Sequence, residues 1–434
     1  MGMVEVAKRA RTASLRLANI KCEDKDRAIL TIAEEIDRER SRIIEVNNKD
    51  IEDSLRKGVA PPLIKRLRLD NSKIDEMVRG LRSLARLEDP VGRTTLCMEI
   101  DEGLELYKVT CPIGVIGAIF EARPDALVQI SSLCLKSGNA VILKGGVEAS
   151  RTNISLTDLI RDVLRRLGKI PEDSVQLVET RKDVAELLKM DDYIDLLIPR
   201  GSTNLVKYIK ENSKIPVLGH TEGICHEYVD EYADLEMAVN ICYDAKVQYP
   251  AVCNAMETLL VHKNIAERFL PVMAEKYRQA NVELRGDPKT RKILPEIKEA
   301  TDEDWRAEYL DLILSIKVVD SIEEAIEHIN LYGSHHTDGI ITMSEENARR
   351  FLMEVDSAVV IHNASTRFSD GYRFGLGAEV GISTGKIHAR GPVGLEGLVI
   401  YKYIVKGSGQ VVSKYTGENA KPFTHRRLSK VWPV

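Results

Sequence analysis

Apolar residues in the N-terminal part of the chain, up to about residue 90, recur every three or four positions, which predicts amphipathic helices. One such stripe consists of Ala28, Ile29, Ile32, Ala33 and Ile36. A second stripe runs over residues 43–55 and stops at Lys57-Gly58, shortly before Pro61-Pro62. Glycine and proline at that point are typical of a helix end. The N-terminal part is therefore predicted to be helical.

From Pro112 onward, short β-branched runs alternate with helical stretches, which predicts a doubly wound, mainly parallel sheet. The predicted strands are residues 115–120, 141–143, 175–178 and 194–198. The helical stretches between and after them are residues 127–133, 154–164, 184–189 and 205–212. A second α/β pattern starts at about residue 230, so we predict a domain boundary near residue 225. Its strands are residues 258–261, 312–319, 339–342 and 357–362, and its helices are residues 238–244, 265–279, 322–329 and 345–355.

Two segments with alternating apolar and polar residues lie outside both patterns, at residues 96–110 and 398–409. Exposed strands of this kind need a pairing partner, because an open edge invites aggregation. A β-ribbon used in subunit assembly meets that need, and we expect a homo-oligomer. The chain beyond Ser413 is polar and basic, as at Arg426-Arg427, and is expected to be a loose surface extension.

Composition and charge narrow the function classes. The 434 residues carry 62 basic and 67 acidic side chains, a net charge of −5, which gives no footprint for nucleic acid. No apolar run approaches ~18 residues, so we expect no membrane span. The first residues contain no continuous apolar stretch, so we expect no secretory signal, and the 7 cysteines lack the spacing of a disulfide framework. A cytoplasmic protein is expected.

Two glycine-containing segments are candidates for ligand binding. Gly201, Ser202 and Thr203 follow a predicted strand and open a helix, where free N–H groups and hydroxyls suit a phosphate. The same residue types also cap helices for structural reasons. Lys144 ends another predicted strand and precedes two glycines. It therefore points to the crevice where parallel sheets bind ligands.

Cys253 differs from the other cysteines because it lies in a polar turn between the first helix and the first strand of the second domain. It is either a nucleophile or a structural cysteine. The remaining cysteines, in helical or strand patterns, are expected to be buried; they are Cys22, Cys97, Cys111, Cys134, Cys225 and Cys242.

The histidines do not predict a metal site. Cys225 and His226 are neighbours that would point to opposite sides of a strand, and no second pair lies at usable spacing from His220. We therefore predict no metal. His335-His336 is expected to form a turn with solvent-exposed rings.

Longer motifs resemble the aldehyde dehydrogenase superfamily, and within it the gamma-glutamyl phosphate reductase family. The resemblance covers about residues 5–410. The motifs that carry it are Pro112-Ile-Gly-Val-Ile-Gly-Ala-Ile, Phe120-Glu-Ala-Arg-Pro-Asp, Gly138-Asn-Ala-Val-Ile-Leu-Lys-Gly-Gly, Gly201-Ser-Thr, Tyr249-Pro-Ala-Val-Cys-Asn-Ala-Met-Glu-Thr, Asn363-Ala-Ser-Thr-Arg-Phe-Ser-Asp-Gly, Gly377-Ala-Glu-Val-Gly-Ile-Ser-Thr and Ala389-Arg-Gly-Pro-Val-Gly-Leu-Glu-Gly-Leu.

The resemblance implies an aldehyde dehydrogenase-like α/β fold with two doubly wound domains and a small oligomerisation ribbon. It implies a dinucleotide-binding domain at residues 1–95 and 112–224, a catalytic domain at 225–397, the ribbon at 96–111 and 398–410, and a tail at 411–434. The implied reaction is the NADPH-dependent reduction of gamma-glutamyl phosphate to glutamate-5-semialdehyde, the second step of proline biosynthesis. A dimer or tetramer, functionally associated with glutamate 5-kinase, is expected.

The resemblance also assigns roles to residues. Cys253 matches the catalytic cysteine, with Asn254 stabilising the oxyanion. Glu308 matches the glutamate on the nicotinamide ribose, and Lys144 the lysine on the adenosine ribose. Val147 stands where an acid often rejects the 2′-phosphate, which favours NADPH. The anions of the substrate need arginines, and the candidates for the substrate site are Arg123, Ser365, Thr366, Arg367, Ser383 and Thr384.

One departure bears on the reaction. The glutamate that activates water in the general aldehyde dehydrogenases is absent at Val217. A reductase of an acyl phosphate has no use for that base. Two alternatives stay open: an aldehyde-oxidising dehydrogenase of the same fold, and a non-catalytic binding protein. Which arginine would meet the phosphate and which the α-carboxylate is also open.

Overall fold

The computed structural model describes residues 2–179 and 181–433. Met1, where the predicted dinucleotide-binding domain begins, Thr180, and Val434, where the predicted tail ends, lie outside the described residues. The chain forms two compact units. Unit 1 comprises residues 1–218, 376–381 and 393–434. Unit 2 comprises residues 219–375 and 382–392.

Unit 1 begins with helices, as the apolar spacing predicts. These are α1 (Met3–Leu17), α2 (Cys22–Arg38), α3 (Arg40–Arg56), α4 (Pro61–Leu67) and α5 (Asn71–Ala85). The predicted stripe of α2 is buried in full. α3 ends where expected, before Gly58, whose φ of +68° is readily adopted only by glycine. The Asp70 carboxylate accepts from the Lys73 N–H at 2.9 Å and caps α5.

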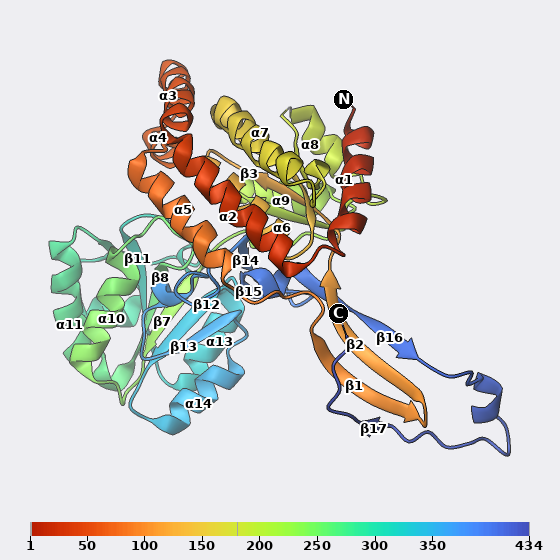
Figure 1. Ribbon diagram of the computed structural model, residues 1–434. Helices are drawn as coiled ribbons and strands as arrows, with labels where there is room; N and C mark the ends of the chain where they lie inside the picture. Colours follow the sequence, from red (N-terminus) through yellow and green to blue (C-terminus); the bar gives the residue numbers. More distant parts are fainter. Residues whose placement is uncertain (1, 180, 434) are drawn as a thin grey trace. The chain divides into compact units, whose positions relative to one another are not determined.

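The central sheet of unit 1 is parallel, with the strand order β5-β4-β3-β6. Its strands are β3 (Val115–Phe120), β4 (Ala140–Lys144), β5 (Val175–Leu177) and β6 (Leu196–Arg200). Every residue of β3 and β4 is buried, because helices cover both faces (Figure 1). The helices that alternate with the strands are α6 (Pro124–Lys136), α7 (Ser150–Leu167), α8 (Arg181–Leu187) and α9 (Thr203–Asn212). The predicted doubly wound sheet is confirmed.

Unit 2 is built on a second parallel sheet, with the order β10-β9-β11-β8-β7-β12-β13. Its strands are β7 (Cys225–Val229), β8 (Met256–His262), β9 (Glu283–Gly286), β10 (Lys298–Glu299), β11 (Ile313–Val319), β12 (Thr337–Ile341) and β13 (Val359–His362). Its helices are α10 (Leu235–Val247), α11 (Lys263–Gln279), α12 (Pro288–Ile293), α13 (Ile322–Tyr332) and α14 (Glu345–Glu354). α10 and α11 pack on one face, and α13 and α14 on the other (Figure 1).

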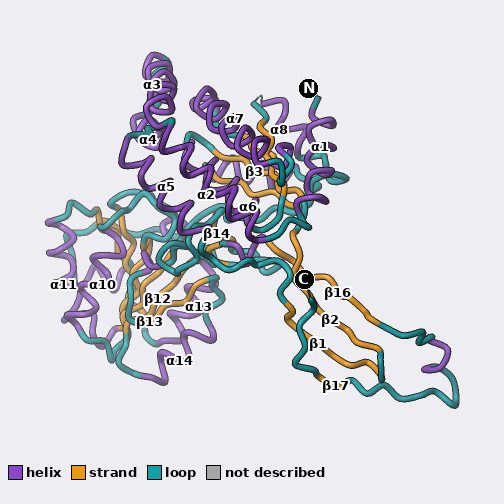
Figure 2. The backbone as a smooth tube through the Cα atoms, in the orientation of Figure 1, coloured by secondary structure: helices purple, strands orange, loops and turns teal. Residues whose placement is uncertain are grey.

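A separate antiparallel sheet of unit 1 has the order β16-β2-β1-β17 (Figure 2). Its strands are β1 (Thr94–Asp101), β2 (Leu104–Pro112), β16 (Val399–Lys406) and β17 (Arg426–Arg427). The two alternating segments pair with each other, β16 with β2, so both are strands as predicted, and their use in subunit assembly stays a prediction. The prediction of a loose tail is wrong, because β17 pairs with β1 and Trp432 packs edge-on against Tyr107, with ring centroids 5.3 Å apart.

The remaining short elements are β14 (Gly381–Ser383), β15 (Gly391–Val393) and the 3₁₀ helices η1 (Val147–Ala149), η2 (Glu172–Ser174), η3 (Asp304–Arg306), η4 (Thr366–Phe368), η5 (Leu395–Leu398) and η6 (Val412–Tyr415). All seven cysteines are free. Burial is confirmed for Cys97, Cys134, Cys225 and Cys242, whereas Cys22 and Cys111 are partly exposed, contrary to expectation. Over the described residues, no helix is both long and apolar enough to span a bilayer.

Candidate active site

The amino-terminal edge of the unit 2 sheet gathers the candidate catalytic groups. Cys253 lies shortly before β8, Glu308 shortly before β11 and His336 directly before β12. These strands, with β7, are neighbours in the order β11-β8-β7-β12. Because parallel strands begin at the same edge of a sheet, the segments before them meet. Cys253 is partly exposed there, in the predicted turn between α10 and β8.

Gly223 fixes the backbone at Cys253. A Cβ atom built on Gly223 would lie 2.0 Å from the carbonyl oxygen of Cys253, so only glycine fits. The thiol of Cys225 donates to the same carbonyl oxygen at 3.2 Å. Burial raises the pKa of Cys225 well above its usual value, which keeps it a thiol donor. The carbonyl of Cys253 is therefore held from two sides.

Glu308 lies against the same glycine. Its Oε1 accepts from the Gly223 N–H at 2.8 Å. Burial raises the pKa of Glu308, opposed by this N–H and by the His220 ring. The N–H of Leu310 donates to Glu257 at 3.2 Å, and Glu257 pairs with buried Lys246 at 2.6 Å. Glu257 follows closely after Cys253 in the chain. Gly223 and Glu257 therefore connect the segment that contains Glu308 to the turn that contains Cys253.

Arg367 is a buried cation without an ion-pair partner among the described residues. The residue is 7% exposed, and its Nε donates to the neutral amide of Gln248 at 3.0 Å. Burial lowers its pKa, as does nearby Arg373, while Asp244, Cys253 and Asp370 oppose this shift. The nearby carboxylate of Asp370 pairs with Arg373 instead, at 3.8 Å. A buried guanidinium whose hydrogen-bond partner is a neutral amide can bind an anion, and that role of Arg367 stays a prediction.

The segment around Arg367 crosses the sheet face towards Cys253. The Thr366 N–H donates to Glu227, in the middle of β7, at 2.9 Å. Burial raises the pKa of Glu227 well above its usual value. Further along, the Asn254 side-chain amide donates to the Ser369 carbonyl at 2.8 Å. One N–H of the Asn254 side chain thus holds the loop that contains Arg367. The predicted role of Asn254 in stabilising an oxyanion stays a prediction.

The predicted hydroxyl donors are mostly engaged in turns. Ser365 Oγ accepts from the Arg367 N–H, and Ser383 Oγ accepts from the Gly385 N–H, both at 3.3 Å. Thr366 is fully buried, and its Oγ1 has no partner among the residues described. Thr384 is partly exposed beside Ser383. Their contact with a substrate stays a prediction.

His336 contradicts the expectation of a solvent-exposed ring, because it is fully buried. It begins β12 at the edge that carries Cys253, and its ring lies edge-on to His220 with centroids 4.9 Å apart. His226, by contrast, is buried against Asp338, with Nδ1 and Oδ1 2.8 Å apart. The position of His336 just before a buried parallel strand could have indicated that its ring is buried. Two adjacent histidines are equally typical of an exposed turn, so the sequence alone did not decide between these predictions.

In unit 1 the predicted nucleotide-binding residues lie at the carboxyl ends of strands, as crevice ligands should. Lys144 ends β4, and its ammonium donates to the Gly145 carbonyl. Gly201, Ser202 and Thr203 follow β6 and open α9. The Glu121 carboxylate accepts from the Ser202 N–H at 2.8 Å and from its hydroxyl at 3.1 Å. An anion therefore already sits at the N-terminus of α9.

The segment after Lys144 makes a close turn. A Cβ on Gly146 would lie 2.8 Å from the Ala122 nitrogen and 2.5 Å from a carboxylate oxygen of Glu148. Glu148 thus folds over Gly146, while Val147 is 54% exposed. Arg123 precedes α6, with its side chain 47% exposed and 3.8 Å from Asp125.

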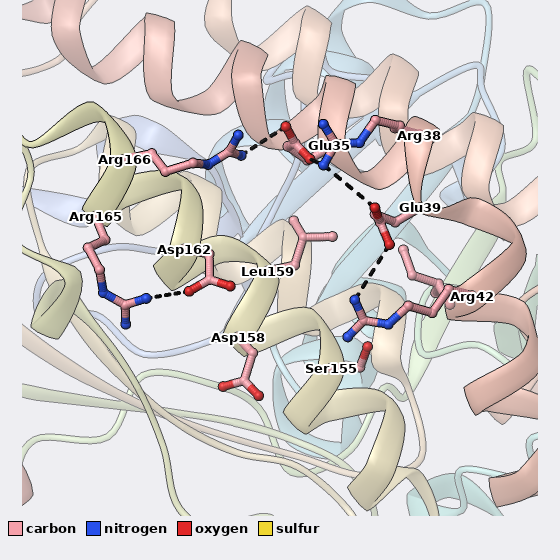
Figure 3. Close-up of a pocket in the computed structure, with 11 residues that line it drawn as sticks. Glu35, Arg38, Glu39, Arg42, Ser155, Asp158, Leu159, Asp162, Arg165 and Arg166 are labelled. Carbon is pink, nitrogen blue, oxygen red and sulfur yellow. Dashed lines mark hydrogen bonds and ion pairs between the residues drawn. The ribbon is translucent and has the colours of Figure 1, made fainter.

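A polar hollow between α2, α3 and α7 is a different kind of surface (Figure 3). Its charges pair with each other: Glu35 with Arg166 at 2.8 Å, Glu39 with Arg42 at 3.5 Å, and Arg165 with Asp162. No cysteine or histidine lines it. These are the solvated faces of helices rather than a reactive site.

Comparison with known proteins identifies the family of the chain. Residues 3–304 match the model of the aldehyde dehydrogenase family. Gamma-glutamyl phosphate reductase of Pelotomaculum thermopropionicum is 58% identical over 434 residues, 100% of this chain and 99% of that protein. The enzyme of the same name from Methanosarcina mazei is 56% identical over 97% of this chain and 96% of its own. The crystal structure of the Thermotoga maritima gamma-glutamyl phosphate reductase superposes with a TM-score of 0.92 at 45% identity, covering 94% of this chain and 99% of that chain.

The chain therefore belongs to the aldehyde dehydrogenase family, and within it to the gamma-glutamyl phosphate reductases. It is an oxidoreductase with the aldehyde dehydrogenase-like α/β fold.

Proposed function

We propose that the chain reduces gamma-glutamyl phosphate to glutamate-5-semialdehyde and phosphate, with NADPH as the reductant, in proline biosynthesis. The observation that carries this is buried Arg367, which has no ion-pair partner within 4 Å among the residues described and lies on the loop that Asn254, the residue after partly exposed Cys253, holds through the Ser369 carbonyl. The names of the relatives support the substrate. Val217 supports the choice of acyl transfer over hydrolysis, because a valine cannot activate water.

The reaction follows from these groups. The Cys253 thiolate attacks the acyl carbon, a carbon–sulfur bond forms, and the carbon–oxygen bond to phosphate breaks. Backbone N–H groups near Cys253, with Asn254, stabilise the developing oxyanion. When bound, the nicotinamide supplies the hydride that reduces the thioester. The carbon–sulfur bond then breaks, which releases the aldehyde and returns the thiolate.

Unit 1 fits a dinucleotide. Gly146 permits the close turn after Lys144 at the end of β4, and the N-terminus of α9 suits a phosphate. Glu308 in unit 2 would hold the nicotinamide ribose. Glu121 must leave the N-terminus of α9 when a phosphate binds there, because two anions cannot share it.

Cofactor preference is testable at Glu148. The wild-type enzyme is expected to have a higher kcat/KM with NADPH than with NADH. Glu148→Gln removes a carboxylate that would repel a 2′-phosphate, and should raise the NADPH-to-NADH ratio about fivefold, the effect of roughly 1 kcal/mol. Steady-state kinetics with both cofactors checks this. An NADH preference in the wild type would refute the NADPH assignment.

Arg367 is proposed to bind a substrate anion. Arg367→Ala should lower kcat/KM for the substrate by ~1.5–3 kcal/mol, the range of charge-assisted hydrogen bonds. Lysine should recover only part of this, because it lacks the bidentate fork. Arg373→Ala, which removes a neighbouring exposed cation, serves as the matched control. Cofactor affinity should hardly change, and a loss that merely follows the melting temperature would make Arg367 structural. Arg123 is the candidate for the second anion.

The reaction itself is tested in reverse, since the acyl phosphate is unstable. NADP⁺ reduction with glutamate-5-semialdehyde should require inorganic phosphate. Steady oxidation to glutamate without phosphate would instead identify an aldehyde-oxidising dehydrogenase. Cofactor binding without turnover in either direction would favour the non-catalytic alternative.

We further propose a homo-oligomer assembled through β16. This strand pairs with β2 along one edge only, and Tyr401, Tyr403 and Val405 are 45%, 59% and 57% exposed. An apolar open edge requires a cover. Tyr403→Lys should reduce the molar mass measured by light scattering, and an unchanged mass would place the interface elsewhere. Functional association with glutamate 5-kinase would protect the acyl phosphate between the two enzymes.

A further inference from the structure

Three side chains at the amino-terminal edge of the unit 2 sheet converge on one point. The ligand atoms of His220, Cys253 and His336 all lie within 4.8 Å of one another. They come from the segments before β7, β8 and β12, which are adjacent strands. Among residues 2–179 and 181–433, these three form the one cluster of cysteine, histidine or acidic side chains whose ligand atoms approach one another this closely.

His336 has a nitrogen that the protein leaves without a partner. The residue is 0% exposed, and its Nε2 has no hydrogen-bond partner among the described residues. Its Nδ1 is hydrogen-bonded to the Thr337 hydroxyl at 2.9 Å, which fixes the ring. A bare buried imidazole nitrogen costs free energy unless a ligand meets it. This nitrogen therefore points to a ligand near Cys253.

His220 is held in the way that metal-bound histidines usually are. Its Nδ1–H donates to the carbonyl oxygen of Ile382 at 2.8 Å, which places the lone pair of the neutral ring on Nε2. A histidine ligand commonly donates its other ring N–H to a carbonyl oxygen in this manner. Both imidazoles are thus oriented by hydrogen bonds that a metal ion would leave in place.

The donor set selects the class of ion. One thiolate and two imidazoles suit Zn²⁺, whereas Mg²⁺ and Ca²⁺ require oxygen ligands. Tetrahedral bonds of about 2.0–2.3 Å put such donor atoms about 3.3–3.6 Å apart. Donors already within 4.8 Å reach that spacing by small side-chain rotations. Three protein ligands leave a fourth position for water.

We propose that Cys253, His220 and His336 bind one Zn²⁺ ion reversibly, and that the bound ion inhibits the enzyme. Inhibition rests on the proposed function, because the metal would occupy the sulfur that must attack the substrate. The ion is an inhibitor rather than a resident cofactor, since a thiolate bound to zinc is not free to form a thioester.

Binding is measured without turnover, so that it stands apart from the reductase assignment. Chelator-treated enzyme is titrated with Zn²⁺ against a chromophoric competitor, and with Co²⁺ to look for a thiolate-to-metal charge-transfer band. We expect one ion per chain and a band that is absent in Cys253→Ser. His220→Gln and His336→Gln should each weaken Zn²⁺ binding about a hundredfold or more, at or beyond the upper end of losses seen when supporting groups around a metal are removed.

Two control variants match the cluster residues: one changes a histidine adjacent to His336 in the sequence, and the other changes a different partly exposed cysteine. His335→Asn changes a partly exposed histidine outside the cluster, and asparagine tolerates its φ of +58°. Cys111→Ser removes a partly exposed thiol elsewhere. Both should bind Zn²⁺ like the wild type. His220 is partly exposed, so its variant keeps the test decisive if His336→Gln fails to fold.

The outcomes separate the two proposals. Stoichiometric binding lost in all three cluster variants, with inhibition reversed by EDTA and not produced by Mg²⁺, supports the site and its effect. Binding of that kind in a protein without reductase activity supports the site and overturns the function. An active reductase whose Zn²⁺ binding is absent, or equal in Cys253→Ser and wild type, overturns the site.

Discussion

Replacing Cys253 by serine is expected to lower reductase activity by about a thousandfold or more while leaving NADPH affinity nearly unchanged. A thiol ionises within reach of neutral pH and an alcohol does not, so serine cannot supply the attacking anion. The side chains have similar volume, and Cys253 is partly exposed, so the fold should tolerate the change. Steady-state kinetics and a fluorescence titration with NADPH measure both quantities.

Cys225→Ser is the control for that experiment. Cys225 is buried and donates to the Cys253 carbonyl, a hydrogen bond that serine can retain. Its activity should stay within about tenfold of the wild type, or ~1.4 kcal/mol of barrier. If Cys253→Ser retained more than about a tenth of the activity, the nucleophile would be elsewhere.

The second large effect is expected at Gly223. Gly223→Ala places a Cβ 2.0 Å from the Cys253 carbonyl oxygen and 2.6 Å from the Cys253 Cα, so the nucleophile's backbone must move. Misplacement by about 1 Å can reduce the rate about a hundredfold, and we expect at least that loss in kcat. The hydrogen bond from Gly223 to Glu308 should be disturbed too, which would raise the KM for NADPH.

Gly80→Ala is the matched control, because a Cβ at Gly80 within α5 meets nothing within 4 Å. That variant should keep full activity and gain helix propensity. Circular dichroism and thermal melting of Gly223→Ala must show a folded protein for the result to bear on the site. A folded Gly223→Ala with normal kcat would mean that the close contact does not position Cys253.

Regular, two-sided apolar patterns predicted the fold well. β3 stands where an unbroken apolar run indicated a strand, because buried parallel strands need apolar residues on both faces, and β8 contains the predicted strand at residues 258–261. Cys225 and His226 were placed on a strand, but β7 was not counted among the strands of the second sheet because His226 and Glu227 are polar, although every residue of β7 is buried. Their burial depends on partners distant in sequence, such as Asp338 for His226. β17 was not predicted for a similar reason, since pairing with β1 rather than its own composition orders it.

The candidate site was predicted in part. Cys253 was found because a cysteine in a polar turn is unusual, and the family resemblance then supplied Glu308. The sequence did not reveal Gly223, Cys225 or His336. The usual rule looks for ligands at the carboxyl ends of parallel strands, whereas these groups meet at the amino ends in unit 2. Only the strand order, which local sequence does not encode, brings the segments before β7, β8 and β12 together.

In the proposed reaction, Cys253 carries a thioester that reacts with phosphate and not with water. A single-turnover experiment with NADP⁺ and glutamate-5-semialdehyde, first without phosphate, tests it most directly. The account predicts a burst of one NADPH per active site, a glutamyl group on the Cys253 peptide by mass spectrometry, and its rapid loss when phosphate is added. Steady NADPH formation in the absence of phosphate, with no glutamyl group on Cys253, would contradict it.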